Sequence, residues 1–328
     1  MKTRAIGQTE VSTIGLGCMN LSHAYGTPPG PEAAEALLLR ALDLGVTHFD
    51  TAALYGFGNN ESLLGKVLSP HRNKLFLASK CGMTGVDGKR VIDGRPETLR
   101  RTCDEALKRL RTDRIDLYYL HRWDKRVPIE ESMGGLSRLV EEGKILSIGL
   151  SEVSADTLRR AHGEHPVSAL QTEYSLWTRN PEIAVLEACR ELDVAFVAFS
   201  PLGRGFLTGA MHDVSALEEK DIRRQMPRFE KDNFARNLHL LDGLKTLAGR
   251  ADISPAQLAL AWLLARDDNI LPIPGTTSIA HLEENMAAGA ARLDPALMDE
   301  LDRLINRQSV TGARYNPATQ SEIGTEEF

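Results

Sequence analysis

Four side chains that could transfer a proton stand at or just after the ends of apolar segments: Asp50, Tyr55, Lys80 and His121. An ammonium at the end of an apolar segment is costly to bury unless a carboxylate pairs with it, so we expect Asp50 to pair with Lys80. The usual pKa of a tyrosine, about 10, is poorly matched to proton donation at neutral pH, and a nearby ammonium lowers it. These residue types predict that Tyr55 donates a proton, that Lys80 lowers its pKa, and that His121 orients a carbonyl oxygen.

This proton-transfer cluster (Asp50, Tyr55, Lys80 and His121) contains no activated nucleophile and no set of metal ligands. Two pairs of side chains have a spacing at which a helix could present both to a metal ion: His162 with His165, and His281 with Glu284. Neither pair has a third ligand, so we interpret both as surface groups. A metal-dependent barrel hydrolase, one alternative, would place several histidines and carboxylates at strand ends. Because the chain supplies protons but no redox group, the cluster implies a bound redox cofactor.

The elements that would position the cluster alternate regularly along the chain. Eight short, unbroken apolar runs are typical of parallel strands covered on both faces: residues 14–17, 46–49, 75–79, 115–120, 145–150, 167–171, 194–199 and 270–273. Five amphipathic segments are predicted to be helices: residues 31–44, 95–111, 129–142, 181–192 and 234–249. This alternation, without a linker, predicts one α/β domain over residues 1–328, a (β/α)8 TIM barrel, with a doubly wound open sheet as the competing fold.

Three segments interrupt the alternation. Residues 81–95 and 202–233 follow strands, on the face where active sites of such barrels form. The tail after about residue 308 could fold over the barrel mouth or be disordered. Residues 3–13 are predicted to form a hairpin that closes the bottom of the barrel.

Composition excludes several classes of partner. The 328 residues carry a net charge of −6, which argues against nucleic acid. No apolar run approaches the roughly 18 residues of a membrane span, and the first seven residues do not resemble a signal peptide. The four cysteines lack CxxC spacing and are expected to be buried thiols in a reducing compartment, by default the cytoplasm: Cys18, Cys81, Cys103 and Cys189.

Several motifs, in this order along the chain, resemble the aldo-keto reductase family. Residues 45–56 (GVTHFDTAALYG) resemble the family signature and are followed by Asn60, Glu61 and Gly65. Further matching segments are residues 116–121 (DLYYLH), 148–151 (IGLS), 171–175 (QTEYS), 199–205 (FSPLGRG), 272–276 (PIPGT) and 282–285 (LEEN). The resemblance covers essentially the whole chain and is nearest to the longer bacterial and plant branch with the proline–leucine–glycine–arginine–glycine loop.

The resemblance implies a barrel that binds NADP(H), with NAD(H) possible, and reduces small-molecule aldehydes and ketones by hydride transfer, with Tyr55 as proton donor. It also implies that Phe199 stacks on the nicotinamide, that Ser151 and Gln171 hold the carboxamide, and that residues 200–205 lie over the pyrophosphate. The cofactor-binding residues implied are Gly17, Met19, Asp50, Ser151, Glu152, Gln171, Phe199, Ser200, Pro201, Leu202, Gly203, Arg204, Gly205, Pro274, Gly275, Thr276, Thr277, His281, Glu284 and Asn285, the last two at the adenine.

The sequence departs from the family pattern at two places. Glu152 stands where many relatives have asparagine, and a carboxylate would accept a hydrogen bond from the carboxamide without donating one. Residues 276–281 lack the lysine or arginine that often binds the 2′-phosphate of NADPH. Hydroxyl groups, backbone amides at a helix start and His281 would replace that charge, so NADPH is expected and use of NADH stays open.

An aromatic substrate pocket is expected beside Tyr55 and His121, formed by Tyr25, Phe57 and Trp123, although Trp123 is equally consistent with a packing role. For Arg122 we expect a surface ion pair with Asp124 or Glu130 rather than a contact with an anionic substrate. Aromatic aldehydes, α-dicarbonyls and pyridoxal-like compounds are the candidate substrates. The alternative function is a cofactor-binding, redox-sensing subunit with little turnover, like the channel subunits that share this fold, and a homo-oligomer is possible.

Overall fold

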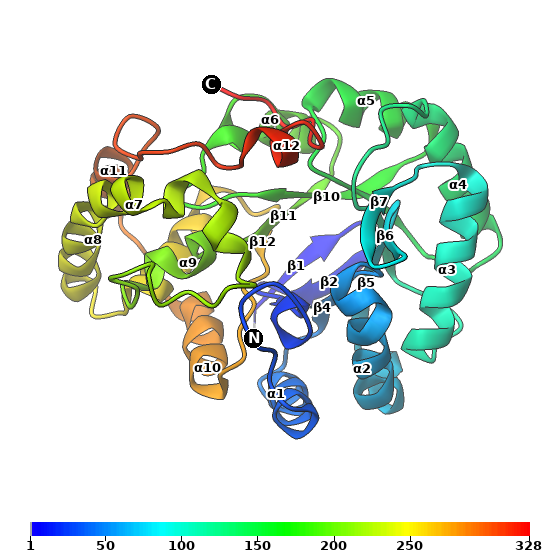
Figure 1. Ribbon diagram of the computed structural model, residues 1–328, viewed down its shortest axis with the longest axis horizontal. Coiled ribbons are helices and arrows are strands. Elements are labelled where there is room, and N and C mark those ends of the chain that lie inside the picture. The colour runs from blue at the N-terminus through cyan, green and yellow to red at the C-terminus, as the bar shows by residue number, and fades with distance from the viewer. Residues whose placement is uncertain (1) are drawn as a thin grey trace.

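Eight parallel strands form the barrel wall in the computed structural model, which describes residues 2–328 (Figure 1). Neighbouring strands are hydrogen-bonded in chain order, and they are β3 (Leu16–Gly17), β4 (His48–Asp50), β5 (Phe76–Cys81), β8 (Leu117–Leu120), β9 (Ile148–Ser151), β10 (Val167–Glu173), β11 (Ala195–Phe199) and β12 (Ile270–Pro272). Each strand overlaps one of the eight predicted apolar runs, and β4, β5, β9 and β10 extend past the predicted end. Because all eight are parallel, their C-terminal ends meet at one mouth.

The sheet closes between its first and last strands. The backbone N–H of Gly15 donates to the Pro272 carbonyl at 3.0 Å, and that of Gly17 donates to the Pro274 carbonyl at 3.2 Å. A Cβ atom on Gly17 would lie 2.8 Å from the Ile273 carbonyl oxygen, so glycine permits this close approach. The predicted closed barrel is therefore confirmed, and the competing open sheet is wrong.

Helices surround the barrel and bury one face against the strands. Their bounds are α1 (Pro31–Asp43), α2 (Asn59–Leu68), α3 (Pro96–Leu110), α4 (Ile129–Glu141), α5 (Ala155–Glu164), α6 (Val185–Glu191), α7 (Lys231–Asn237), α8 (His239–Arg250), α9 (Pro255–Arg266), α10 (Ile279–Ala287), α11 (Pro295–Leu304) and α12 (Pro317–Gln320). Proline begins α1, α3, α9 and α11, where its missing N–H costs no helical hydrogen bond.

Two predicted helices differ from the observed ones. The helix predicted over residues 181–192 begins at Val185, after a separate 3-10 turn at Asn180–Glu182. The helix predicted over residues 234–249 is two helices, α7 and α8, with a break at Leu238. Next to this break the Asn237 side chain donates to the Thr311 carbonyl at 2.9 Å and accepts from the Thr311 N–H at 2.8 Å, which fixes the tail to the end of α7.

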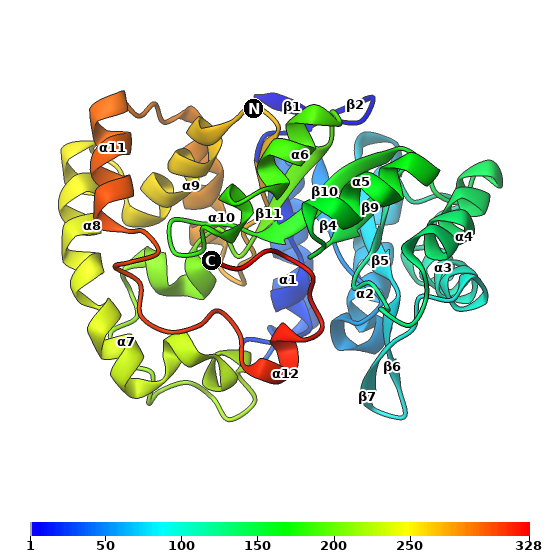
Figure 2. The same ribbon diagram turned by 90° about the horizontal axis from the view of Figure 1, so that it is seen from above.

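The N-terminal hairpin closes the barrel bottom as predicted. Its strands β1 (Thr3–Ile6) and β2 (Thr9–Ser12) place Ile6 and Val11 in the apolar cluster that fills the barrel interior, together with Phe76, Leu117 and Leu271. Figure 2 shows this hairpin at one end of the molecule, and α7, α12 and a second hairpin at the other end.

That second hairpin, β6 (Met83–Val86) and β7 (Lys89–Ile92), lies within the glycine-rich segment after β5. Asp87 and Gly88 both adopt positive φ, 49° and 73°, as a two-residue hairpin turn requires. The Asp-Gly pair is the sequence signal for this hairpin. The hairpin was not predicted, because residues 81–95 were interpreted as a segment that interrupts the alternation of strands and helices.

The C-terminal tail is folded, which decides between the two alternatives left open by its composition. It runs from α11 across the molecule through α12 to a terminus near α6 (Figures 1 and 2). Arg314 and Ile323 are buried, and the Gly324 N–H donates to the Glu152 carbonyl at 2.7 Å.

All four cysteines are buried free thiols, as expected. Among residues 2–328, no helix combines the length and apolar character that crossing a bilayer demands.

Gly65 on α2 is predicted to be essential for the contact between α2 and α3. A Cβ atom at this position would lie 2.1 Å from the backbone oxygen of Arg109, so the helices would have to separate. We expect Gly65→Ala to destabilise the protein by about 1–3 kcal/mol, measured by thermal unfolding followed by circular dichroism. Gly163→Ala on α5, where a Cβ atom meets open space, is the control and should be neutral or stabilising. Equal stability of Gly65→Ala and wild type would contradict the close packing.

His48 gives the stability of the barrel a pH dependence. It is fully buried, and neither ring nitrogen has a hydrogen-bond partner among the described residues. Burial lowers the pKa of His48 from 6.5 to about 4. Between these pH values the unfolded chain binds a proton that the folded chain excludes, so stability decreases as pH falls through this range, by up to about 3 kcal/mol, and no further below it.

The expected result is that His48→Leu removes this component from the dependence of urea unfolding on pH. His212→Gln, at an exposed histidine, should keep the wild-type dependence. Parallel curves for wild type and His48→Leu would show that His48 is not the group responsible.

Candidate active site

The proton-transfer cluster assembles at the mouth of the barrel. Asp50 ends β4 and Lys80 lies near the end of β5, and these strands are adjacent in the sheet. The Lys80 ammonium pairs with the Asp50 carboxylate, donates to the Thr51 carbonyl at 2.8 Å and lies 3.4 Å from the Tyr55 hydroxyl. His121 follows β8, and its ring meets the Tyr55 ring edge-on at a centroid distance of 5.9 Å. The predicted pairing of Lys80 with Asp50 is confirmed.

Neighbouring polar side chains hold the cluster in place. Gln171 Nε2 donates to the second oxygen of Asp50 at 2.7 Å. The Thr51 hydroxyl donates to Asn60 Oδ1 at 2.6 Å, and Asn60 donates onward to the Cys18 carbonyl at 2.9 Å. These buried bonds tie the loop after β4 to the start of α2 and to the loop after β3. They fix the position from which Tyr55 projects.

The protonation states suit proton donation. Burial raises the pKa of Tyr55 above its usual value, and Lys80 only partly opposes that rise. Burial alone would lower the pKa of Lys80, but Asp50 and Tyr55 outweigh it, so the pKa is raised and the amine stays charged. For His121, burial lowers the pKa well below its usual value, and Arg122 lowers it further. At neutral pH the cluster therefore contains a protonated phenol, a charged ammonium and a neutral imidazole.

Lys80 acts on Tyr55 in the predicted direction, because it lowers the pKa of the phenol. The desolvation of the buried phenol is the larger effect, so the net pKa is raised rather than lowered. Lys80 still favours the phenolate relative to the same burial without it. His121 Nδ1 is buried without a hydrogen-bond partner among the described residues, and His121 lines the cavity at the barrel mouth.

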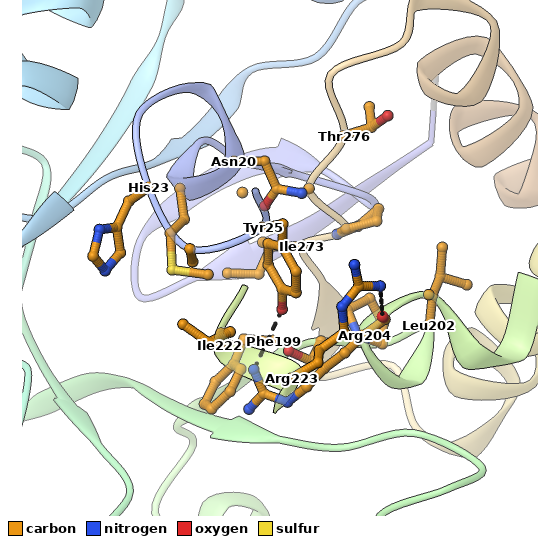
Figure 3. A pocket seen from close by; sticks show the side chains of 18 of the residues that line it. Asn20, His23, Tyr25, Phe199, Leu202, Arg204, Ile222, Arg223, Ile273 and Thr276 are labelled. Atoms are coloured by element: carbon orange, nitrogen blue, oxygen red, sulfur yellow. Dashed lines mark hydrogen bonds between the residues drawn. The ribbon is translucent and has the colours of Figure 1, made fainter. Parts of the chain in front are cut away.

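A cavity of about 920 Å³ opens at the barrel mouth, with Asp50, Tyr55 and His121 in its wall. Most of the residues implied as cofactor-binding also line it: Gly17, Met19, Ser151, Gln171, Phe199, Ser200, Pro201, Leu202, Arg204, Gly205, Pro274, Gly275, Thr276, Thr277, His281, Glu284 and Asn285. Figure 3 shows part of this wall, with His23 and Leu202 on opposite sides of the view and Phe199 and Ile273 between them. Lys80 is fully buried and is not among the lining residues, but its partners Asp50 and Tyr55 are.

Besides Lys80, four predicted site residues are not among those that line the cavity. The Glu152 carboxylate pairs with Arg314 and accepts from the Thr325 hydroxyl at 3.0 Å and from the Glu173 N–H at 2.9 Å. The buried Gly203 faces Trp177. Phe57 is 55% exposed and lies against Gly85 of the second hairpin. Trp123 donates to the Val127 carbonyl at 2.9 Å within its own loop, which is the packing role.

The predicted ion pair of Arg122 is wrong as well. Arg122 is buried in the cavity wall, where its Nη1 donates to the His121 carbonyl at 2.7 Å and to Ser151 Oγ at 3.3 Å. Its two expected partners are bound by other arginines: Asp124 by Arg126, and Glu130 by Arg160. The loop after β8 therefore turns Arg122 inward and Arg126 outward.

A buried charge network supports the loop of residues 200–205. Arg204 donates to Glu173 at 2.6 Å, to the Tyr25 hydroxyl at 3.3 Å and to the Tyr315 hydroxyl at 3.0 Å. Burial alone would raise the pKa of Glu173, but Arg204 and Arg314 outweigh it and lower that pKa to about 2. Figure 3 shows Tyr25, Arg204 and Arg223 lying together at the cavity. The loop thus presents a fixed cation to the cavity.

Several residues of this network and of the cavity wall were not predicted from the sequence. Asn20, Arg223, Tyr315, Asn316 and Thr319 line the cavity. Three of them belong to the tail, and one of the contacts that hold the tail over the mouth is the pairing of Arg314 with Glu152, 162 residues away in sequence. No local pattern in the sequence signals such a pairing.

Within residues 2–328, no group of three histidine, cysteine or acidic side chains is placed to hold a metal ion.

Comparison with known proteins places the chain in one family. The model of the "Aldo/keto reductase family" matches residues 13–306. The chain is 45% identical to "Aldo-keto reductase yakc [NADP(+)]" of Schizosaccharomyces pombe over 98% of this chain and 96% of the relative. It is 43% identical to "Probable aldo-keto reductase 1" of Glycine max over 93% and 89%, respectively.

Solved structures agree with this assignment. The glycerol dehydrogenase AKR11B4 from Gluconobacter oxydans superposes with a TM-score of 0.86 at 27% identity, over 96% of this chain and 98% of the other. The aldo-keto reductase AKR11C1 from Bacillus halodurans, in its holo form, superposes with a TM-score of 0.80 at 28% identity, over 97% and 99%. With its barrel, its proton-transfer cluster and these matches over nearly its whole length, the chain belongs to the aldo/keto reductase family.

Proposed function

We propose that this protein reduces aldehydes and ketones to alcohols with NADPH, and that Tyr55 donates the proton. The observation that carries the proposal is the cluster itself, in which a protonated Tyr55 lies beside the Lys80 ammonium and a neutral His121 in the wall of one cavity. Membership of the aldo/keto reductase family supports this reaction class. The S. pombe relative carries NADP(+) in its name, which supports NADP(H) as the cofactor.

The cavity wall fits an extended dinucleotide. Phe199 offers a flat face for the nicotinamide ring, and Ser151 and Gln171 offer polar groups for its carboxamide. Between them and α10, the loop of residues 200–205 suits a diphosphate, because its backbone is curled by positive φ values at several residues and Arg204 adds a cation. Glu284 and Asn285 on α10 would meet the adenine. When bound, the dihydronicotinamide supplies a hydride to the carbonyl carbon.

The chain's own residues then handle the carbonyl oxygen and its proton. His121 Nε2 binds the oxygen and holds it toward the Tyr55 hydroxyl. Tyr55 donates its proton to that oxygen as the carbonyl carbon is reduced, and the Lys80 ammonium stabilises the phenolate that forms. Asp50 keeps Lys80 in place. The buried position of the cluster keeps these charges strong by excluding water.

The cofactor preference depends on residues 276–281. Thr276, Thr277 and His281 line the cavity there, and Ser278 caps α10 by accepting from the His281 N–H at 3.4 Å. These groups can bind a 2′-phosphate without a fixed positive charge, so a moderate preference for NADPH over NADH is expected.

We expect His281→Arg to raise the ratio of kcat/KM with NADPH to kcat/KM with NADH by about tenfold or more, because a guanidinium adds charge-assisted hydrogen bonds. His212→Arg, at an exposed site that does not line the cavity, is the charge-matched control. An unchanged ratio in His281→Arg would show that position 281 does not face the 2′-phosphate.

The reaction is tested by following oxidation of NADPH and NADH with 4-nitrobenzaldehyde and methylglyoxal, in the presence of excess chelator. Turnover of either carbonyl supports the proposal. Tight cofactor binding without turnover would instead indicate a redox-sensing subunit, and loss of turnover in chelator would indicate that the reaction needs a metal.

The four buried free thiols support a reducing compartment, the cytoplasm, as the location of the protein.

A further inference from the structure

Arg122 is a cation in the cavity wall that lacks a carboxylate partner. It is only 9% exposed, and it directly follows His121 at the end of β8. Its one engaged nitrogen, Nη1, donates to two neutral acceptors, the His121 carbonyl oxygen and the Ser151 hydroxyl. Within residues 2–328 no carboxylate forms an ion pair with it. Burying a guanidinium against neutral groups alone is unfavourable, so this position is best explained by a ligand.

The other arginines of the cavity wall are all paired. Arg90 pairs with Glu322 at 2.5 Å, Arg204 with Glu173 at 2.6 Å, and Arg223 with Asp221 at 2.6 Å. Arg122 is thus the exception among the four arginines that the structure places in this wall.

The charge of Arg122 is not balanced by an acidic group. Two further cations lie near His121, and both are paired: Lys80 with Asp50, and Arg90 with Glu322. Among residues 2–328, the carboxylates that line the cavity are those of Asp50 and Glu284. Asp50 is held by Lys80 and Gln171, and Glu284 lies on α10 with the groups expected to bind adenine. The end of the cavity beside His121 therefore has a positive charge available to a ligand.

We propose that Arg122 binds an anionic oxygen group, a carboxylate or a phosphate, on the carbonyl substrate. The preferred substrates are then aldehydes and ketones that carry such a group, and this inference rests on the proposed reductase function. Arginine Nε and Nη2 have no acceptor among the described residues, and together they form the fork that grips two oxygens of one anion. The bonds from Nη1 hold this fork beside His121, which binds the carbonyl oxygen of the same molecule.

Two pairs of substrates that differ in charge test the proposal. 4-Carboxybenzaldehyde and 4-nitrobenzaldehyde have nearly the same shape, and glyceraldehyde 3-phosphate is compared with glyceraldehyde. For wild type, we expect kcat/KM to favour the anionic member of at least one pair, and the pair that shows it distinguishes a carboxylate from a phosphate. In Arg122→Met this preference should fall by about tenfold to a hundredfold, as expected for the loss of a charge-assisted, two-pronged contact.

Arg126→Met is the matched control, because Arg126 lies in the same loop but its side chain is 78% exposed and pairs with Asp124. It removes the same charge from the surface and should keep the wild-type preference. The dissociation constant for NADPH, measured by fluorescence, is recorded for each variant.

Three results would overturn the inference. One is equal efficiency of wild type with both members of each pair, and another is an unchanged preference in Arg122→Met. The third is a loss in Arg122→Met that is the same for charged and neutral substrates and accompanies weaker NADPH binding, which would assign Arg122 to the carboxamide beside Ser151. In all three cases wild-type turnover of 4-nitrobenzaldehyde leaves the reductase function standing, whereas no turnover of any substrate would reject that function itself.

Discussion

Replacing Tyr55 with phenylalanine is expected to lower kcat for carbonyl reduction by about 10²–10⁴-fold, the usual contribution of a general acid. The phenol is the one group of the cluster that is protonated, uncharged and 3.4 Å from the Lys80 ammonium. Phenylalanine keeps the ring that meets His121 edge-on and lies under Lys80, so the shape of the cavity is preserved. Binding of NADPH should therefore persist while turnover is lost.

Tyr118→Phe is the matched control for that experiment. Tyr118 is fully buried on β8, and its hydroxyl has no hydrogen-bond partner among the described residues, so the same change there should leave kcat near the wild-type value. Steady-state assays of both variants with 4-nitrobenzaldehyde give the comparison. If Tyr55→Phe kept more than about a tenth of wild-type kcat, another group would have to donate the proton.

The second large effect is expected at Lys80, where a single substitution acts on both stability and activity. Lys80 and Asp50 form a fully buried ion pair, with side-chain exposures of 0% and 2%. Lys80→Met leaves the Asp50 carboxylate buried with Gln171 as a remaining donor, and breaking such a pair costs about 3–5 kcal/mol. A lower unfolding midpoint and loss of turnover are both expected.

The double variant Asp50→Asn with Lys80→Met separates these two effects. It removes both charges while nearly keeping the volumes, so most of the stability lost in the single variant should return. Turnover should not return, because no ammonium would be left to stabilise the phenolate. A double variant as unstable as Lys80→Met would mean that the cost lies in packing, and recovery of activity in it would contradict the role given to Lys80.

Much of the fold and the centre of the site could be predicted because their signals are local. Unbroken apolar runs identify parallel strands, and the polar residue at the end of each run must lie at the barrel mouth, as Asp50, Lys80 and His121 do. The pairing of Lys80 with Asp50 followed from the cost of burying a lone ammonium. The hairpin turn at Asp87 and Gly88 was equally readable, but it was overlooked within a glycine-rich segment.

The rest depended on contacts between distant segments. The Glu152 carboxylate pairs with Arg314 of the tail and does not line the cavity. No sequence motif near Glu152 or Arg314 identifies the other as its partner. Arg122 points into the cavity, whereas Asp124 and Arg126 of the same loop pair with each other. No local pattern in the sequence signals which of the two arginines turns inward. The raised pKa of Tyr55 reflects a degree of burial that only the assembled mouth of the barrel creates.

The most direct test of the central proposal, carbonyl reduction with proton donation by Tyr55, uses NADPH that carries deuterium at the transferable position of the nicotinamide. The wild-type protein is incubated with this cofactor and 4-nitrobenzaldehyde, and the alcohol is analysed by mass spectrometry and NMR. We predict one deuterium on the carbinol carbon for wild type, and labelled alcohol that forms at least about 100-fold more slowly with Tyr55→Phe. Alcohol formed without deuterium, or no alcohol from wild type with bound NADPH, would contradict the proposal.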